Sequence, residues 1–382
     1  MPTLFEYYRQ HAFVPTTFDI LSPEKLARHR AKRENLYINK LSIPRLLWRD
    51  ARVLEVGPAS GENALICAQD GARLAFVEPL EPAVERLHAL FRHYGQQNAI
   101  DTVHIDTIEN VSLPEAAFDV VIAEGFLGTL RRRDEVIRSL FASLGPDGLL
   151  IVSVNDSVGS FVECMKGAIA QLACRVRSLT DLDDCVRAVE PFFAEDFHRI
   201  PHSRPFELWV KDALFNPLMD LDNFYDFDLV LEDLAPLDPH FYSSWPCYLS
   251  PNDLTWHKYA PSPQARHRDI LAAYRLRRSS FLLGEVLDPE PSLAALLEQA
   301  NDNPADWVRT VLLAHQAELR RNDSGTLLDA LTRIAPHRKG RVRQLLDECL
   351  LNLQRPDPAT YLDSPLLRSH WGVPYHYLVF RR

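Results

Sequence analysis

The sequence lacks the short cysteine motifs that usually hold a metal or a redox-active pair. Its six cysteines are scattered over 382 residues, and no two of them are separated by only two residues. A chain of this size can bury a core without disulfides, so we expect reduced, buried thiols. The histidine pair His198 and His202 is interrupted by Pro201, and no carboxylates are arranged around it as ligands. We therefore predict no metal site.

Long apolar runs and an excess of positive charge are also missing. No run approaches the length that spans a bilayer, and the start MPTLFEYYRQHAF lacks the basic and apolar regions of a secretory signal. We expect a cytoplasmic protein with no membrane partner. The formal net charge of −10 argues against broad nucleic-acid binding. The basic stretch LRRRDE (130–135) is interpreted as the solvated start of a helix.

Short apolar runs alternate with helical stretches in the first half of the chain. The predicted strands are 52–57, 73–79, 101–106, 118–125 and 148–156. Strands separated by helices at this spacing indicate right-handed βαβ crossovers. The sequence therefore predicts an α/β fold with a doubly wound, mostly parallel sheet.

Changes in composition divide the chain into five segments. The stretch after residue 202 is crowded with proline, aspartate and aromatic residues. Linkers are poor in aromatics, so we expect this stretch to be ordered and to cover something. The segments are a helical lead-in (1–50), a cofactor-binding core (51–202), an aromatic-rich cover (203–262), a helical region (263–355) and a C-terminal strand region (356–382).

The sequence RVLEVGPASGENALI predicts a strand that runs into a glycine-containing turn. The dinucleotide fingerprint G-x-G-x-x-G, counted from Gly57, would need glycine at Ala59 and Glu62. A methyl group and a charged side chain stand there instead. The pattern acidic-x-G-x-G-x-G fits better, because it reads Glu55, Gly57, Ala59 and Gly61 and departs by one methyl group.

This turn resembles motif I of the class I S-adenosylmethionine (SAM) methyltransferases. The segments SRPFELWVKDALFNPL (203–218) and WGVPYHYLVF (371–380) are similar to bacterial members found near surface-glycan and secondary-metabolite genes. The resemblance implies SAM as the cofactor and a seven-stranded sheet. It also implies that YHYLVF (375–380) returns to the sheet as an antiparallel strand, which makes 263–355 a helical insertion.

The chemistry of SAM suits this turn. SAM has no pyrophosphate, so the backbone must come close to the amino-acid and ribose parts, which glycine permits. Glu78 ends the second strand, where a carboxylate can accept the ribose hydroxyls, although NAD enzymes place an acid there too. Asp106 ends the third strand, where such enzymes hold an acid near the adenine amino group. The expected cofactor-binding residues are Glu55, Gly57, Pro58, Ala59, Gly61, Glu78, Pro79, Asp106, Thr107, Glu124 and Gly125.

Two residues are candidates for catalysis. Methyl transfer needs a nucleophile held in line, and a general base assists a hydroxyl or an amine. The fourth strand ends in AEGFLG rather than the (D/N)PP(Y/F) of enzymes that methylate amide or exocyclic base nitrogens. Glu124 could act on the substrate or bind the cofactor's ammonium, and both interpretations stay open. His202 is the second candidate base, and a structural histidine is its alternative.

The acceptor pocket is predicted in the segment 203–259, together with the helical insertion, closing over the cofactor. Aromatic side chains with a few polar groups are the usual walls of such pockets. Arg204 favours an acceptor that carries an acid or a phosphate. The alternative is that the aromatics only pack this segment onto the sheet. The candidate substrate-binding residues are Asn155, Arg204, Trp209, Tyr242, Trp245 and Trp256.

We therefore expect a SAM-dependent methyltransferase that acts on an O or N atom of a small molecule or glycan. One alternative is an NAD(P)-dependent oxidoreductase, which Glu62 disfavours because a third glycine would stand at its position. The other is a non-catalytic SAM-fold protein that serves in binding or as a scaffold. In the second alternative, the long helical insertion would be the interaction surface. A homodimer through this insertion is the protein partner that we expect.

Overall fold

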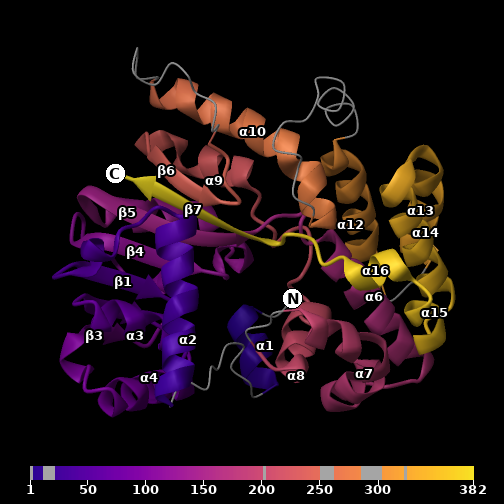
Figure 1. Ribbon diagram of the computed structural model, residues 1–382, viewed down its shortest axis with the longest axis horizontal. Coiled ribbons are helices and arrows are strands. Elements are labelled where there is room, and N and C mark those ends of the chain that lie inside the picture. The colour runs from indigo at the N-terminus through magenta and orange to yellow at the C-terminus, as the bar shows by residue number, and fades with distance from the viewer. Residues whose placement is uncertain (1–2, 12–21, 201–203, 250–261, 285–302, 322–324) are drawn as a thin grey trace.

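The computed structural model describes residues 3–11, 22–200, 204–249, 262–284, 303–321 and 325–382 (Figure 1). Seven strands form one sheet in the order β3-β2-β1-β4-β5-β7-β6. Neighbours from β3 to β5 pair in parallel, and β7 is antiparallel to both β5 and β6. The strands are β1 (Arg52–Val56), β2 (Arg73–Val77), β3 (Ile100–His104), β4 (Phe118–Glu124), β5 (Leu144–Asn155), β6 (His240–Trp245) and β7 (Tyr375–Arg381). This confirms the predicted doubly wound sheet with its returning C-terminal strand.

Helices cover both faces of the sheet because the central strands are apolar on both sides. Val53 and Ile151 face one layer of helices, whereas their neighbours Leu54 and Val152 face the other. This alternation is the period of two that a strand imposes. The first layer contains α3 (Glu62–Gln69) and α4 (Glu81–His93). The second contains α5 (Arg133–Ala142), α9 (Phe227–Leu234) and α10 (Pro263–Leu283).

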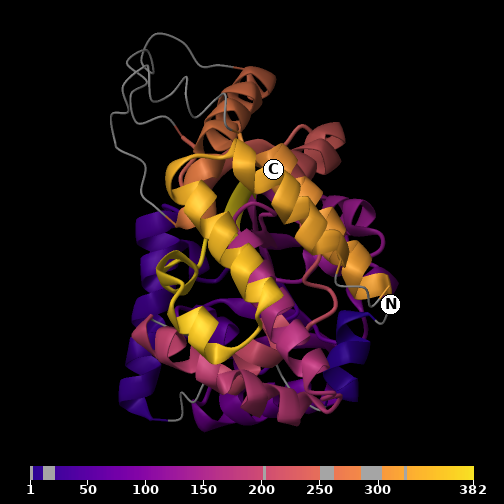
Figure 2. The ribbon, with the colours of Figure 1, turned by 90° about the vertical axis from the view of Figure 1, so that its right-hand side faces the viewer.

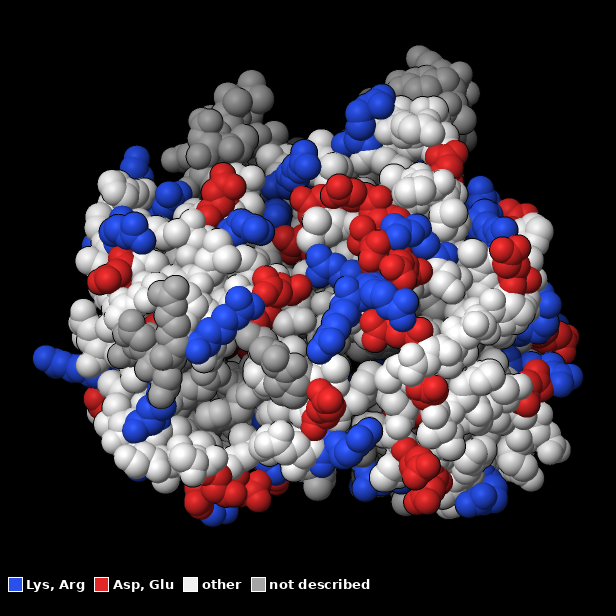
Figure 3. All heavy atoms as spheres, turned by 180° about the vertical axis from the view of Figure 1, so that it is seen from behind, with Lys and Arg blue, Asp and Glu red and all other residues white. Residues whose placement is uncertain are grey.

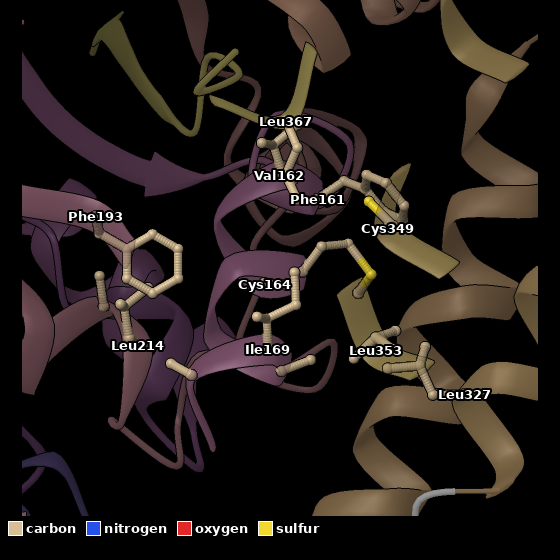
Figure 4. Close-up of a cluster of buried hydrophobic side chains, with 14 of the residues drawn as sticks. Phe161, Val162, Cys164, Ile169, Phe193, Leu214, Leu327, Cys349, Leu353 and Leu367 are labelled. Carbon is tan, nitrogen blue, oxygen red and sulfur yellow. The ribbon is translucent and has the colours of Figure 1, made fainter. Parts of the chain in front are cut away.

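A second group of helices, which we call the helical lobe, packs around its own apolar core beside the sheet. Figure 2 views this lobe with its orange and yellow helices nearest the viewer. Its core brings Phe161 and Cys164 of α6 against Leu327 of α13 and Cys349 of α14 (Figure 4). The lobe consists of α6 (Phe161–Val176), α7 (Leu182–Arg199), α12 (Pro304–Arg321), α13 (Gly325–Ile334), α14 (Gly340–Gln354), α15 (Pro358–Leu362) and α16 (Pro365–Ser369).

The boundaries of the later segments differ from those expected. The predicted cover segment 203–262 contributes β6 and α9 to the sheet and its helical layer. The predicted insertion 263–355 divides, because α10 packs on the sheet while α12, α13 and α14 join the helical lobe. Among the described residues, none of the helices combines the length and the hydropathy needed to cross a membrane.

Three N-terminal or connecting elements reach the carboxyl edge of the parallel strands. They are α1 (Leu4–Gln10), α2 (Pro23–Glu34) with the π-helical turn η1 (Asn35–Lys40), and α8 (Phe206–Trp209) with the π-helical turn η6 (Val210–Leu214). In Figure 1, α1 and α8 lie near each other below the start of β7, and α2 stands in front of the strands of the sheet. Turns with π-helical bonding are frequent at functional sites.

Candidate active site

The turn after β1 has the backbone conformation that its composition predicts. Gly57, Ala59 and Gly61 all have positive φ angles, of 69°, 49° and 83°. A Cβ at Gly61 would lie 2.8 Å from Cγ of Leu87 on α4, so only glycine lets α3 begin this close to its neighbour. Ala59 adopts the left-handed conformation despite its methyl group, which costs about 1 kcal/mol or more. The one departure from the glycine pattern is therefore a strained residue.

Glu78 holds this turn in place from the end of β2. Its Oε2 accepts a hydrogen bond from the Ala59 amide at 3.0 Å, and its Oε1 accepts one from the Leu80 amide at 3.0 Å. Burial raises the pKa of this carboxyl, and the two amide donors act in the opposite direction. Each carboxylate oxygen has two lone pairs, so each can accept a further donor. Glu78 thus can bind a pair of hydroxyl groups without releasing the turn.

Glu55 lies below the turn as a buried acid that is only partly satisfied. It is 4% exposed, and its Oε2 has no hydrogen-bond partner in the described part of the chain. Burial, together with the nearby carboxylate of Glu124, raises the pKa of Glu55 to about 8, although Arg33 acts in the opposite direction. Glu55 is therefore largely protonated at neutral pH in the ligand-free protein.

Glu124 ends β4 and is held by an arginine from α2. Both terminal nitrogens of Arg33 donate to its carboxylate, at 3.1 Å and 2.6 Å. Arg33 also donates to the Tyr37 hydroxyl and stacks over that ring, with Cζ 4.6 Å from its centroid. The Tyr377 hydroxyl lies 3.5 Å from the same carboxylate. Both oxygens of Glu124 thus accept hydrogen bonds from Arg33, and its action on the substrate or on the cofactor's ammonium stays a prediction.

The helix α1 docks on the turn η6 through two adjacent tyrosines. The Tyr7 hydroxyl donates to the Lys211 carbonyl at 2.7 Å, and the Tyr8 hydroxyl donates to Asp212 Oδ1 at 2.8 Å. The other oxygen of Asp212 accepts from Arg204. Residues 204 and 212 belong to the segment in which we predicted the acceptor pocket, but their partner on α1 was not expected.

One cavity of about 430 Å³ is lined by most of these groups, although Gly61, Tyr7 and Tyr37 do not border it. It follows the carboxyl edge of the sheet, where open α/β sheets bind their ligands. Its volume lies in the range of small-molecule pockets. A smaller adjoining hollow of about 40 Å³ contains Asn155 and shares Tyr8, Gly125, Asp212 and Tyr375 with the main cavity. Residues that line the main cavity include Tyr8, Arg33, Glu55, Gly57, Pro58, Ala59, Glu78, Pro79, Glu124, Gly125, Arg204, Asp212, Tyr375 and Tyr377.

Several predicted residues lie away from the cavity. Trp209 is buried among aromatic rings of the helical lobe, and its indole N–H donates to Glu163 at 2.7 Å. The Tyr242 hydroxyl donates to the Ser42 carbonyl at 2.9 Å. Both Tyr242 and Trp245 pack in the layer that contains α3 and α4. These three aromatics follow the alternative interpretation, in which they pack the segment onto its surroundings.

Asp106 and Thr107 lie outside the residues that line the cavity. The Asp106 carboxylate accepts from the Thr107 amide and from Asn110, so it is engaged within its own loop. The candidates His202 and Trp256 lie outside the described residues. Within the described ranges, no residue between 263 and 355 lines either hollow, so this part of the insertion does not close over the cavity.

Sequence reasoning missed the residues that come from α1 and α2. Tyr8 and Arg33 stand in ordinary helical patterns, and each meets its partner 204 or 91 positions further along the chain. A weak signal was present for α1, because Thr3 and Glu6 form a capping box that fixes the start of a short helix. No local pattern shows where that helix docks.

Comparisons with known proteins point to one family. A family model described as a methyltransferase domain matches residues 26–209. Comparison with curated proteins finds no match. Among solved structures, the chain is similar to a SAM-dependent methyltransferase from Mesorhizobium loti, with 18% identity, a TM-score of 0.29 and coverage of 33% of this chain and 54% of that one. This chain thus spans about half of the length of that structure.

Two further structures are similar over comparable stretches. The CcbJ methyltransferase from Streptomyces caelestis has 22% identity and a TM-score of 0.29, and the match covers 35% of this chain and 55% of that one. Phosphoethanolamine N-methyltransferase 1 from Haemonchus contortus, solved with phosphoethanolamine and S-adenosylhomocysteine, has 17% identity, a TM-score of 0.31 and coverage of 38% and 30%.

The cavity suits the cofactor of this family. Its left-handed turn brings the backbone close to a ligand, Glu78 has acceptor positions for two hydroxyls, and Glu55 Oε2 is a buried acceptor without a partner in the described structure. These features fit a ribose and an ammonium better than a pyrophosphate, which would need a row of donors. Residues 26–209 therefore match a methyltransferase domain, and the cavity that they help to form suits S-adenosylmethionine as the cofactor.

Proposed function

We propose that the protein transfers a methyl group from SAM to an O or N atom of a small molecule or glycan. The observation that carries this proposal is the continuity of the cavity. It begins at the cofactor turn beside Gly57 and Glu78 and extends past Gly125 to Ser153 and Tyr375, at the ends of β5 and β7. A cofactor and an acceptor can therefore share one space, which brings the methyl group and its acceptor atom together as methyl transfer requires.

The residues present divide this space between the two ligands. When bound, SAM supplies a methyl group on a positively charged sulfonium. Glu78 would accept the ribose hydroxyls while it keeps its bonds to the turn. The opposite end, between α1, η6 and β7, presents the phenol rings of Tyr8, Tyr375 and Tyr377, which suit an acceptor with an apolar or ring-shaped body.

The charges at the acceptor end favour a neutral acceptor. Arg204 is ion-paired with Asp212. An anionic acceptor would have to displace Asp212 from Arg204, which would leave a partly buried carboxylate without its partner. The acidic or phosphorylated acceptor expected from Arg204 alone is therefore not the one that we propose.

Asp212 is the carboxylate that we propose to orient the acceptor. It borders both hollows and already accepts from Tyr8 and Arg204. A carboxylate can accept up to four hydrogen bonds, so it can also receive the hydrogen of an acceptor hydroxyl or amine. Arg33 donates to both oxygens of Glu124, whereas Arg204 donates to only one oxygen of Asp212, so Glu124 is less suited to hold that proton.

Formation of S-adenosylhomocysteine, measured by mass spectrometry, tests the proposal. We expect turnover with neutral ring compounds that carry a hydroxyl or amine, and less with their carboxylated counterparts. Asp212→Asn should abolish turnover and keep SAM affinity, whereas Asp222→Asn, which alters an exposed ion pair with Arg320, should change neither. Tight NAD binding without SAM binding would favour the oxidoreductase alternative. SAM binding with no turnover on any compound would favour a non-catalytic binding protein.

The expected partners stay predictions, and each needs its own measurement. On the face shown in Figure 3, acidic and basic side chains are interspersed, so this face has no continuous basic patch of the kind that binds nucleic acid. A homodimer through 263–355 would double the mass measured by light scattering in solution. Cytoplasmic location can be checked by fractionating cells that express the tagged protein.

A further inference from the structure

Resting on the proposed function, we infer that the smaller hollow beside the main cavity takes a second hydroxyl or amino group of the acceptor, and that the side-chain carbonyl of Asn155 receives its hydrogen. The acceptor is then a neutral ring compound with two hydrogen-bond donors, one that is methylated and one that enters the hollow. We call this space, which Asn155, Asn216 and Asn223 border, the side hollow. Glu78 and the turn after β1 do not line it, so it is distinct from the cofactor's end of the cavity.

The side hollow adjoins the acceptor end of the main cavity and is small. Tyr8, Ser153, Asp212 and Tyr375 border both spaces. Its volume is about 40 Å³, whereas one buried water needs about 10–15 Å³ of such space, so it holds a group of a few non-hydrogen atoms but not a ring. A ring that lies against Tyr8 and Tyr375 can therefore place one substituent in the side hollow.

Asn155 provides an unpaired acceptor on the wall of the side hollow. Its Oδ1 is buried and accepts no hydrogen bond from the described residues. Its Nδ2 lies 3.8 Å from the sulfur of Met219, a weak acceptor that an N–H can face but a carbonyl cannot. Met219 thus orients the amide so that its carbonyl stays unpaired. Buried polar groups are nearly always paired in native proteins, so this carbonyl points to a ligand that supplies a donor.

The backbone holds Asn155 in a fixed position. Asn155 is the last residue of β5 and pairs with Tyr375 on β7. Its main-chain carbonyl accepts the Tyr225 amide at 3.0 Å. Because side chains on paired strands are positioned more precisely than those on loops, this carbonyl can discriminate between ligands that differ in one donor.

Most of the other polar side chains around the side hollow already donate to the protein. Their hydroxyl and amide donors are used in four contacts: Tyr8 and Asn216 to Asp212, Asn223 to Asp220, and Thr129 to the Phe126 carbonyl. What these groups still offer a ligand is chiefly the lone pairs of their oxygen atoms. Of the described residues that line the side hollow, Asp212 alone is charged, and Arg204 balances its charge. The side hollow therefore suits an uncharged donor and not a carboxylate or a phosphate.

Two pairs of ring compounds with matched shapes test this inference. Catechol and resorcinol carry a second hydroxyl, which ortho-fluorophenol and meta-fluorophenol replace by a fluorine that cannot donate. Binding is measured by calorimetry with saturating S-adenosylhomocysteine, and turnover by mass spectrometry with SAM. At least one diol should bind about tenfold or more tightly than its fluorinated counterpart, with kcat/KM higher by a similar factor, because the fluorinated compound leaves the Asn155 carbonyl unpaired.

Variants of Asn155 show whether this carbonyl is the source of the preference. Asn155→Leu removes it, keeps a branched side chain, and should bring the diol and its counterpart within about threefold of each other while SAM affinity is unchanged. Asn155→Asp keeps an acceptor and should keep the preference. Asn98→Leu, which alters an exposed amide, is the matched control and should behave like wild type. If Asn155→Leu fails to fold, the wild-type comparison and Asn155→Asp still decide the question.

The outcomes separate this inference from the proposed function. Equal binding of each diol and its fluorinated counterpart, or binding of none of these compounds, would overturn the inference and leave the side hollow as a place for bound water. A preference that persists in Asn155→Leu would overturn it as well, while the proposed function would stand. Preferential binding of a diol without turnover would support the inference and count against methyl transfer. Failure of S-adenosylhomocysteine to bind the wild-type protein would refute the proposed function, and the inference would fall with it.

Discussion

Binding of SAM should release nearly one proton at neutral pH, and Glu55 should be its source. Burial raises the pKa of Glu55 to about 8, with Glu124, Glu62 and Glu78 acting in the same direction and Arg33 against them. At a pH of about 7, a group with this pKa is about nine-tenths protonated. SAM brings a sulfonium and an ammonium, and a nearby cation lowers the pKa of an acid. If the pKa returns to its usual 4.5, about 0.9 proton leaves for each cofactor bound.

The sign of the pH dependence follows from the same shift. In the ligand-free protein, Glu55 keeps its proton below its pKa of about 8, and this proton must leave before the carboxylate can meet the cation. The apparent affinity for SAM should therefore rise with pH, by about fivefold between pH of about 7 and 8, and level off above that range.

Calorimetry in two buffers with different enthalpies of ionisation measures the release directly. Glu55→Gln should bind SAM with no proton release and with an affinity that is flat over this pH range. Glu85→Gln, which alters an exposed acid on α4, should behave like wild type. A wild-type enthalpy that is the same in both buffers, or equal proton release by Glu55→Gln, would refute the reasoning.

Three further outcomes are expected. Gly61→Ala should lower the free energy of unfolding by about 2–4 kcal/mol, because the new Cβ would meet Leu87 at a residue with positive φ. Gly95→Ala has open space around it and should lower the free energy of unfolding only by its backbone strain, about 1–2 kcal/mol. Equal losses in the two variants would contradict this expectation. Glu78→Ala should weaken SAM by about tenfold or more in calorimetry, since it removes the acceptor for the ribose and for two amides. Deletion of residues 373–382 should yield insoluble protein, because β7 lies between β5 and β6; a soluble truncation that binds SAM would be incompatible with this sheet order.

The parts of the fold that depend on neighbouring residues were predictable from the sequence. The strands β1 to β5 and β7 stand where apolar runs indicated them, and the turn from Gly57 to Gly61 has the positive φ angles that its glycines suggest. Such patterns work because burial of alternate side chains and the absence of a Cβ are properties of the local chain. The strand β6 was missed because HFYSSW lies among prolines and aromatics that read as a covering loop.

The walls of the site, by contrast, depend on contacts between distant parts of the chain. Arg33 meets Glu124 across 91 positions, Tyr8 meets Asp212 across 204, and the tryptophan at 209 turns into the helical lobe instead of the cavity. Each of these residue types is common on a helix, so composition and spacing do not show which partner the side chain contacts. The packing of α1 and α2 against the carboxyl edge of the sheet determines those contacts. Sequence alone therefore determined the cofactor turn, whereas the tertiary structure determined what surrounds it, because a helix records its own amphipathic period but not the partner that it buries.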